Sequence, residues 1–245
     1  MGCKGKVALV TGAAGSGMGR SIALTLAREG AKVVVNTRRS VSNAEAVAAA
    51  IQQQGGQAMA VQADIFDAAQ CKSMVDTVCQ QWGQIDICII GPGGGWHPEG
   101  IHQLPPEAAQ EHLHDETAPI FNLMPLVLPG MYTRGWGRVI GIAMHLGKPS
   151  PAYAYNLGKA ARTQALLMAA EQAWGQGVTI NVIAPGPVGG LPTLEAAVKQ
   201  CYRTADADWQ ARGTVSPQDI AEGTAFLCSE GGQFITGCVL PYLFH

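Results

Sequence analysis

The stretch Lys6–Gly19, with the sequence KVALVTGAAGSGMG, joins an apolar strand-like run to a glycine-rich turn, and a helical pattern begins directly after it. Glycine in such a turn lets the backbone approach a pyrophosphate closely and points the helix amino terminus at its charge. A tight strand-to-helix connection alone would also use glycine. The position after the first strand of a repeating series favours dinucleotide binding. The predicted phosphate contacts are Gly12, Ser16, Gly17, Met18 and Gly19.

Short β-branched runs alternate with alanine-rich segments of helical period along the chain, which is typical of βαβ units on a parallel sheet. The expected strands are Lys6–Thr11, Lys32–Asn36, Ala58–Gln62, Ile85–Ile90, Arg138–Ala143, Val178–Ile183 and Ile235–Leu240. The expected helices include Arg20–Glu29, Asn43–Gln54, Ala68–Trp82, Ala152–Trp174 and Pro217–Cys228. This order predicts an α/β fold, a three-layer Rossmann-type doubly wound parallel sheet of about seven strands.

No linker or repeat interrupts residues 1–245, so we expect a single domain. The stretch from 187 to 215 follows the sixth expected strand, is rich in proline and glycine at its start, and is compatible with a helix from Leu194 onward. An insertion at the carboxyl end of a strand is where a substrate lid would lie. We therefore predict a lid in this stretch.

The composition excludes several classes of partner. Sixteen basic against eighteen acidic residues give a net charge of −2 with no basic block, so nucleic acid is not expected. No apolar run reaches the roughly 18 residues that cross a bilayer, which predicts no membrane partner and, by default, a cytoplasmic location. The seven cysteines include no CxxC pair and are expected to be reduced. The histidines near residues 97–114 lack zinc spacing, so no metal is expected.

Motifs along nearly the whole chain, from Lys6 to about Tyr242, resemble those of the short-chain dehydrogenase/reductase family. They are Thr11-Gly12 with Gly17 and Gly19, Asp64, Tyr155-x-x-x-Lys159, Asn181 with Pro185-Gly186, and Ile235-Thr236-Gly237. The family has three residues between the Thr-Gly pair and Gly-x-Gly, whereas this chain has four. The resemblance implies a nicotinamide cofactor, a small-molecule substrate, and a homodimer or homotetramer formed through the fourth and fifth helices.

The end of the second expected strand distinguishes the two nicotinamide cofactors, because a carboxylate there binds the ribose 2′-hydroxyl whereas arginine accommodates a 2′-phosphate. The sequence reads Asn36-Thr37-Arg38-Arg39, with two arginines and no acid. NADP is therefore favoured over NAD, although arginines at a strand end are also ordinary solubilising residues. The resemblance implies further cofactor contacts, which are Asp64, Ile65, Gly91, Tyr155, Lys159, Pro185, Gly186 and Val188.

Tyr155 and Lys159 are four residues apart and would project from one face of a helix. An ammonium beside a phenol favours the phenolate and lowers its pKa, which suits tyrosine for exchanging a proton while hydride moves. Placed on the helix after the fifth strand of such a series, the pair predicts the catalytic centre.

Two catalytic positions depart from the family pattern. Met144 stands where the family has a serine that holds the substrate oxygen, and a thioether cannot donate a hydrogen bond. His145 is either its substitute or a solvent-facing loop residue. Counting back from Leu128-Pro129, which resembles the end of the family's fourth helix, puts Glu116 at the proton-relay asparagine. Glu116 is either a relay or base, or an ion-pair partner of Lys159 that joins two helices.

A substrate pocket is predicted beyond the fourth strand, where the family has Asn-Asn-Ala-Gly and this chain has Ile90-Gly91-Pro92-Gly93. Trp96 and His97 follow on a loop and are predicted substrate contacts together with Met144 and His145. A surface turn held by the tryptophan is the alternative.

Three functions fit these residues. The first is an NADP(H)-dependent oxidoreductase acting on a carbonyl or hydroxyl through Tyr155 and Lys159. The second is a non-redox lyase, dehydratase, cyclase or retro-aldol enzyme that uses Tyr155, Lys159 and Glu116 as acid and base. The third is a catalytically silent cofactor-binding subunit.

Overall fold

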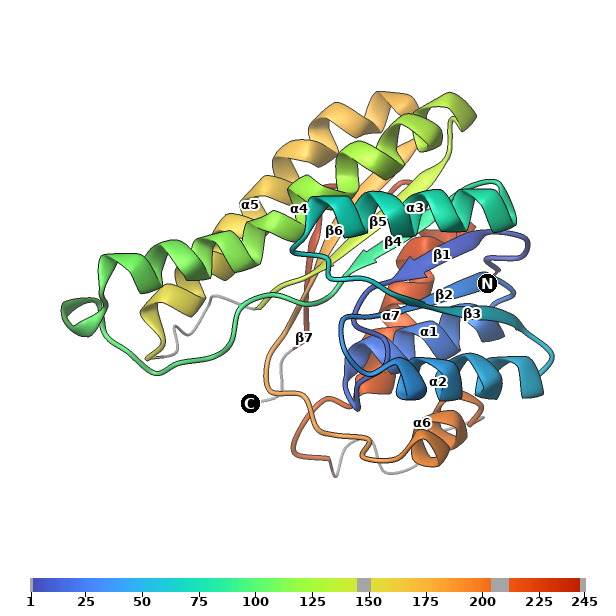
Figure 1. Cartoon of the computed structure of the whole chain (residues 1–245), viewed down its shortest axis with the longest axis horizontal. Helices are drawn as coiled ribbons and strands as arrows, with labels where there is room; N and C mark the ends of the chain where they lie inside the picture. The colour runs from blue at the N-terminus through green and yellow to red at the C-terminus, as the bar shows by residue number, and fades with distance from the viewer. Residues whose placement is uncertain (1, 145–150, 204–211, 243–245) are drawn as a thin grey trace.

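A computed structural model describes residues 2–144, 151–203 and 212–242 of the chain. Its parallel sheet has the strand order β3-β2-β1-β4-β5-β6-β7 (Figure 1), which confirms the predicted doubly wound fold. The strands are β1 (Val7–Val10), β2 (Lys32–Thr37), β3 (Gln57–Gln62), β4 (Ile87–Ile90), β5 (Gly137–Ile142), β6 (Val178–Pro185) and β7 (Val239–Tyr242). The helices are α1 (Met18–Arg28), α2 (Val41–Gln53), α3 (Ala68–Trp82), α4 (Pro106–Arg134), α5 (Tyr153–Ala173), α6 (Leu194–Cys201) and α7 (Pro217–Cys228). Short 3-10 turns are η1 (Ile101–Gln103), η2 (Trp174–Gln176) and η4 (Glu230–Gly232).

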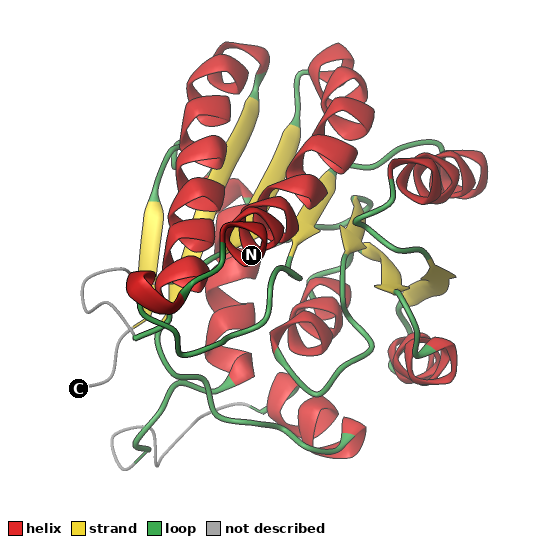
Figure 2. Ribbon diagram, turned by 60° about the vertical axis from the view of Figure 1, so that its left-hand side comes forward, coloured by secondary structure: helices red, strands yellow, loops and turns green. Residues whose placement is uncertain are grey.

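Helices cover both faces of the sheet (Figure 2), so its central strands are apolar on both sides. Alternate side chains of β1 point to opposite faces. Ala8 and Val10 pack with α1, α2 and α7, whereas Val7 and Leu9 pack with α3, α4 and α5. The two resulting cores explain why the strands read as continuous apolar runs instead of alternating ones.

The strand order reverses between β1 and β4, and this switch point is where ligands bind in open α/β sheets. Thr11 joins the two strand ends there. Its hydroxyl donates to the carbonyl of Ile89 at 2.8 Å and accepts from the N–H of Gly91 at 3.0 Å. The loops after β1 and β4 are therefore held side by side at the carboxyl edge.

The expected seventh strand, Ile235–Leu240, was wrong at its start, because β7 begins at Val239. The buried side chain of Asn181 in β6 occupies the positions that a ladder would use. Its amide donates to the carbonyl of Ile235 at 2.7 Å and accepts from the N–H of Cys238 at 3.0 Å. A β-branched composition cannot show that a neighbouring side chain will take over this pairing.

Helix α4 also corrects an expectation. The expected end at Leu128-Pro129 was wrong, because the helix continues to Arg134 and ends at Gly135, which has a left-handed φ of 63°. Three prolines lie inside the helix, and each lacks the N–H of a backbone hydrogen bond. The helix packs against α3 and α5, so tertiary contacts outweigh the lost bonds.

The two ends of the stretch predicted as a lid, near residues 188 and 215, are joined by backbone pairing. Val188 pairs with Val215 in a parallel bridge, and the N–H of Gly189 donates to the carbonyl of Val215 at 2.8 Å. Helix α6 lies within the stretch, as the helix-compatible sequence from Leu194 predicted. That the stretch acts as a lid stays a prediction.

The seven cysteines are free thiols, as expected from their spacing. Burial raises the pKa of Cys3 and Cys71 to about 11 and that of Cys88 to about 12. Within the described part of the chain, no cluster of three metal-ligating side chains is found. No helix there is long and apolar enough to cross a membrane.

Replacing Asn181 with alanine should destabilise the fold. Two part-buried backbone groups, the Ile235 carbonyl and the Cys238 N–H, would lose their partners, and an unsatisfied group that is fully buried costs about 1–3 kcal/mol. We expect the free energy of unfolding to fall by about 2 kcal/mol in urea denaturation. Gln164→Ala, on the exposed side of α5, is the control. Equal stability of the two variants would contradict the role of Asn181.

Candidate active site

Asn36, at the end of β2, fixes the glycine-rich loop. Its side-chain oxygen accepts from the N–H of Gly12 at 3.3 Å, and its backbone carbonyl accepts from the N–H of Ala13 at 2.9 Å. Its amide nitrogen donates to the carbonyl of Ala63 at 3.1 Å. Sequence reasoning missed this role, although a polar residue that ends a run of three valines was a usable signal.

Two of the predicted phosphate-loop glycines cannot carry a side chain. Gly12 has φ +64°, and a Cβ there would lie 2.5 Å from Cγ of Pro92. A Cβ at Gly19 would lie 2.6 Å from the Gly12 carbonyl oxygen. Helix α1 begins at Met18, two residues before the expected start at Arg20. Gly17 gives the helix no side-chain cap, so its first N–H groups remain available to a ligand.

A cavity of about 330 Å³ lies at the carboxyl ends of β1, β2 and β4. Its lining residues are Gly12, Asn36, Arg38, Ala63, Asp64, Ile65, Phe66, Pro92, Gly93, Gly95 and Asp115. The Arg38 guanidinium carbon lies 5.7 Å from the centroid of the Phe66 ring, and Nη1 lies 3.8 Å from the Asp64 carboxylate. Apolar and polar side chains thus line this cavity together with Gly12, Gly93 and Gly95, and such a lining fits the adenosine half of a dinucleotide.

The remaining predicted cofactor residues lie nearby on the edge of the sheet. Thr37 is buried, and its hydroxyl accepts from the N–H of Ser40 at 3.2 Å. Pro185 ends β6, and the N–H of Gly186 donates to the carbonyl of Tyr242 at 2.8 Å. The cofactor contacts of these residues and of Val188 stay predictions.

Tyr155 and Lys159 lie on the first turns of α5. The Lys159 ammonium is 5.2 Å from the centroid of the Tyr155 ring, and only 6% of the lysine is exposed. Burial, with the Glu116 charge as a second cause, raises the pKa of the Tyr155 phenol above its ordinary value of 10.0. Burial lowers the pKa of Lys159. The expected lowering of the phenol pKa was therefore wrong for this arrangement, because burial of the phenol and the nearby Glu116 charge both disfavour the phenolate.

Glu116 is completely buried and forms ion pairs with two cations of α5. One carboxylate oxygen lies 2.9 Å from Nζ of Lys159 and accepts from the N–H of Gly94 at 2.9 Å. The other oxygen lies 2.8 Å from Nε of Arg162. The ion-pair alternative from the sequence is thus present in the structure, with a second partner that was not predicted.

Arg162 is also fully buried and donates hydrogen bonds to backbone carbonyls of α4, the loop after β4, and β5. Its Nε donates to the carbonyl of Glu116 at 3.0 Å, and Nη1 donates to those of Gly91 and Ile142, each at 3.0 Å. Nη2 donates to the carbonyl of Pro92. These bonds join α4 and α5 to the ends of β4 and β5. Sequence reasoning missed Arg162. The usable signal was a second cation three residues after Lys159 in an alanine-rich helix.

Two glycines make room for Glu116. A Cβ at Gly93 would overlap its carboxylate, and a Cβ at Gly158 would lie 2.8 Å from its Cγ. The glycine that survives in the loop after β4 and the glycine before Lys159 are therefore required by the buried acid.

The predicted substrate residues are less closely grouped. Met144 follows β5 and is half-buried, whereas His145 lies outside the described residues. Trp96 is 54% exposed. The ring of His97 lies 5.7 Å from that of His112 on α4.

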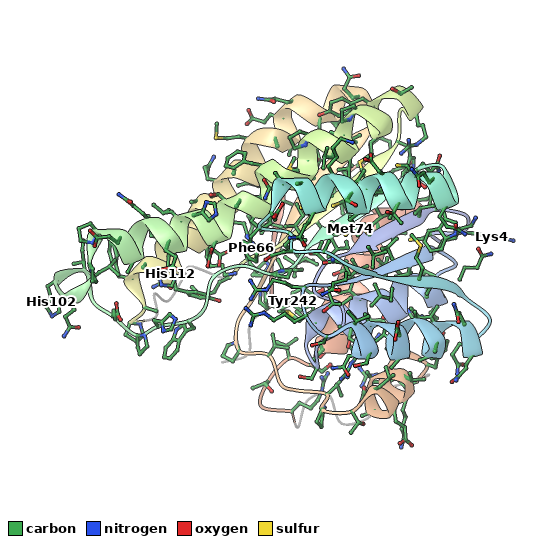
Figure 3. All side chains as sticks on the ribbon, viewed as in Figure 1. Lys4, Phe66, Met74, His102, His112 and Tyr242 are labelled. Carbon is green, nitrogen blue, oxygen red and sulfur yellow. The ribbon has the colours of Figure 1, made fainter. Side chains whose placement is uncertain are left out.

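His97 also lines a cavity of about 260 Å³ with Gly95 and Glu99 of the same loop and with α4 residues that include His112 (Figure 3). The described lining contains neither Tyr155 nor Met144. Contact of Trp96 and His97 with substrate stays a prediction.

Comparison with known proteins identifies the architecture. The family described as "Enoyl-(Acyl carrier protein) reductase" matches residues 12–242. The 3-oxoacyl-[acyl-carrier-protein] reductase FabG of Staphylococcus aureus (strain Mu50) is 31% identical over 235 residues, covering 95% of this chain and 94% of its own. The chain belongs to the short-chain dehydrogenase/reductase family.

Solved structures of the family agree over almost the full length. A 7α-hydroxysteroid dehydrogenase complexed with NADH and 7-oxo glycochenodeoxycholic acid has a TM-score of 0.84 at 28% identity, covering 98% of this chain and 94% of that one. A hydroxysteroid dehydrogenase from Escherichia coli has a TM-score of 0.82 at 29% identity, covering 98% of this chain and 96% of that one.

A further relative by sequence is the trihydroxynaphthalene reductase PfmaI of Pestalotiopsis fici, which is 29% identical over 253 residues, covering 97% of this chain and 88% of its own. This short-chain dehydrogenase/reductase is therefore related to oxidoreductases over its whole length.

Glu116→Gln should destabilise the protein, because Lys159 and Arg162 would both lose their carboxylate. Removing one partner of a buried ion pair costs about 3–5 kcal/mol. We expect a loss of about 3 kcal/mol in the free energy of unfolding in urea. Glu111→Gln, on the exposed side of α4, should stay within about 0.5 kcal/mol of the wild type. A Glu116→Gln variant as stable as this control would show that the charge cluster is not balanced as described.

Proposed function

We propose that the chain is an NADP(H)-dependent oxidoreductase that interconverts a carbonyl and a hydroxyl group on a small molecule. The observation that carries the proposal is the Tyr155–Lys159 pair on α5. Lys159 is paired with Glu116, whose carboxylate lies against Gly93, and Gly93 lines the cavity at the switch point of the sheet. The relatives named as reductases and dehydrogenases support the reaction type. Met144 and Glu116 depart from the family pattern, so the variants below probe the site directly.

The cofactor choice rests on charge. The end of β2 offers Arg38 and no carboxylate from its own strand, which favours a 2′-phosphate over a free 2′-hydroxyl. Gly12, Asn36, Asp64 and Ile65 would hold the adenosine half against the sheet edge. When bound, the nicotinamide supplies or accepts the hydride.

Tyr155 is the group that moves the proton. Its phenol oxygen donates a proton to the substrate oxygen in reduction and accepts one in oxidation. Because burial and the Glu116 charge raise its pKa, the phenol is protonated at neutral pH, the form that reduction requires. Lys159 positions the tyrosine ring, and its ammonium also pairs with the Glu116 carboxylate at 2.9 Å.

Met144 favours a second candidate, the non-redox enzyme. The Met144 thioether, which stands at the position of the family's serine, offers no hydrogen bond to a developing oxyanion, and losing such a donor costs about 10²–10³ in rate where it has been measured. Acid and base chemistry by Tyr155, Lys159 and Glu116 would not require that donor. The experiment below separates the two functions.

Tyr155→Phe should abolish oxidation of NADPH by a panel of ketones, followed by absorbance. Removing a general acid typically costs about 10²–10⁴ in rate. Tyr153→Phe is a matched control, because Tyr153 is on the same helix, 43% exposed, and has no lysine four residues on. Full activity in Tyr155→Phe would overturn the assignment. Conversion of a substrate without any absorbance change would favour the non-redox enzyme.

The pH profile of ketone reduction should reflect the raised pKa of Tyr155. Reduction needs the protonated phenol, so kcat/KM should hold through neutral pH and fall only above the ordinary tyrosine value of 10.0. Glu116→Gln removes one of the causes that raise this pKa, so the fall should move to lower pH. An unchanged profile, or one moved to higher pH, would contradict this. Glu111→Gln should keep the wild-type profile.

We propose that the protein forms a homodimer or homotetramer through α4 and α5, which lie side by side along one side of the molecule (Figure 1). Large apolar side chains are exposed on these helices, with Phe121 65%, Met168 58% and Leu157 40% accessible. A second copy would cover them. The cytoplasmic location stays a prediction from the sequence.

Phe121→Asp combined with Met168→Lys should lower the mass in light scattering, because charges would face one another across an apolar interface. Phe234→Asp is the control, since Phe234 is 80% exposed but lies outside both helices. A wild-type monomer, or a double variant with the wild-type mass, would refute the interface.

A further inference from the structure

A buried arginine next to the glycine-rich loop has no carboxylate partner among the residues that the structure describes. Arg20, in the first turn of α1, is only 6% exposed. One guanidinium nitrogen donates to the carbonyl of Leu191, and Nε has no hydrogen-bond partner. No acidic group contributes to its pKa, which burial alone lowers. By contrast, buried Arg162 faces Glu116 and half-buried Arg28 faces Glu29 and Glu222.

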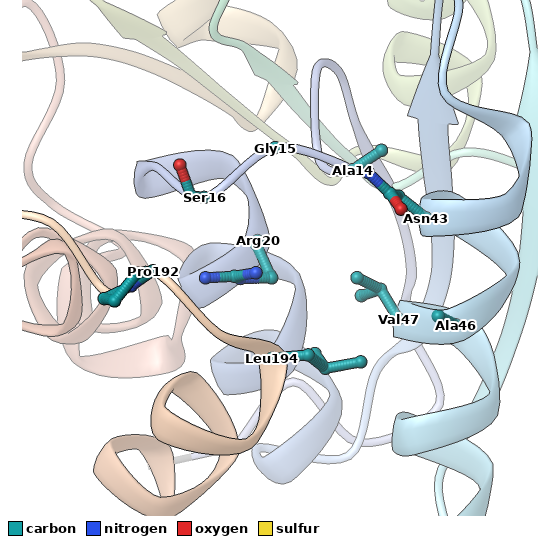
Figure 4. A pocket seen from close by; sticks show the side chains of 9 residues that line it. All are labelled: Ala14, Gly15, Ser16, Arg20, Asn43, Ala46, Val47, Pro192 and Leu194. Atoms are coloured by element: carbon teal, nitrogen blue, oxygen red, sulfur yellow. The ribbon is translucent and has the colours of Figure 1, made fainter.

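Arg20 lines a cavity of about 360 Å³ between α1, α2 and the start of the predicted lid (Figure 4). The lining residues are Ala14, Gly15, Ser16, Arg20, Asn43, Ala46, Val47, Pro192 and Leu194. None of these nine is acidic. The volume is about ten times the share of one water molecule in the liquid, so the cavity can hold a polyatomic anion.

Two helix amino termini meet at this cavity. Ser16 precedes the first turn of α1, and Asn43 lies in the first turn of α2. Neither helix has a side-chain cap hydrogen bond or an acid in its first turn. Their free N–H groups and dipoles therefore favour negative charge at the same place as the uncompensated guanidinium.

We propose that this cavity is a phosphate site, in which Arg20 and the two helix amino termini bind a phosphomonoester or inorganic phosphate dianion. Arginine provides planar paired donors for phosphate oxygens, and the Ser16 hydroxyl and Asn43 amide provide further donors. The fourth residue between Gly12 and Gly17 lengthens the loop that forms one wall of the site.

Two sources could supply the same phosphate chemistry. One is the 2′-phosphate of the dinucleotide, and this source rests on the proposed NADP dependence. The other is free phosphate or a phosphorylated small molecule, which does not depend on the proposed function. Arg38, on which the proposed NADP preference rests, lines the neighbouring cavity beside Asp64 and Phe66, so Arg20 is a second and separate cation.

The test is calorimetric titration of the full chain with inorganic phosphate at constant ionic strength. Loss of the charge-assisted hydrogen bonds in Arg20→Gln should weaken phosphate binding by roughly tenfold or more. Asn43→Ala should weaken it less. Lys72→Gln removes an exposed positive charge on α3 and should bind phosphate like the wild type. No phosphate binding by the wild type, or equal binding by Arg20→Gln, would overturn the site.

Competition identifies the source. If phosphate weakens the binding of NADPH but not of NADH, and Arg20→Gln removes this difference, the site takes the 2′-phosphate. If Arg20-dependent phosphate binding leaves both dinucleotides unaffected, the site takes free phosphate. Both results support the anion site, and neither requires hydride transfer. If the protein binds phosphate through Arg20 but reduces no ketone, the proposed reaction is refuted and the anion site stands.

If Arg20→Gln does not fold, Arg20→Lys provides a second test. Arg20→Lys keeps the charge but loses the planar fork, so phosphate binding should weaken without being abolished. Phosphate should also raise the melting temperature of the wild type more than chloride does at equal ionic strength. Equal shifts with the two anions, together with unchanged binding by Arg20→Lys, would contradict the proposal.

Discussion

A carboxylate that is fully buried must be balanced by positive charge, and the arrangement around Glu116 follows from that requirement. Lys159 faces one oxygen at 2.9 Å and Arg162 faces the other at 2.8 Å. Desolvation of such a cluster costs several kcal/mol for each ion, which is recovered only when geometry and further hydrogen bonds are complete. Gly93 and Gly158 leave the space that the acid needs. Arg162 then uses its remaining donors on the carbonyls at the ends of β4 and β5.

The same cluster sets the chemistry of the tyrosine. Lys159 is paired with Glu116, while burial and the Glu116 charge raise the pKa of the Tyr155 phenol. A protonated phenol suits the donation of a proton to a carbonyl oxygen. Met144 adds no donor of its own, so the proposed reaction relies on the tyrosine more heavily than a site with a neighbouring hydroxyl would. The departure at Glu116 is accommodated by a second buried charge, because Arg162 faces the carboxylate at 2.8 Å.

Sequence patterns predicted the fold well where local chemistry decides it. The ends of α3 and α7 matched, because Asp67 caps the first and Ser216 forms a capping box in the second. The start of β7 was wrong, since it depends on hydrogen bonds from Asn181 that are formed between residues more than fifty positions apart. At the site, the Tyr155–Lys159 spacing and the ion pair with Glu116 could be anticipated.

Two arginines show why the rest could not be predicted. Arg162 reads as an ordinary helix former until α4 and the ends of β4 and β5 place four carbonyls around it. Arg20 reads as a solvent-facing residue after the glycine motif until the segment at Leu191 covers it. Burial of this kind depends on which distant segment packs against a side chain, and no local period contains that information.

The proposed hydride transfer can be followed directly with an isotope. NADPH deuterated at the nicotinamide carbon that gives up hydride would be incubated with the protein and a ketone, and the alcohol analysed by mass spectrometry. The account predicts one deuterium in each molecule of alcohol, bound to the former carbonyl carbon. Alcohol without deuterium, or substrate converted while the cofactor keeps its label, would contradict it.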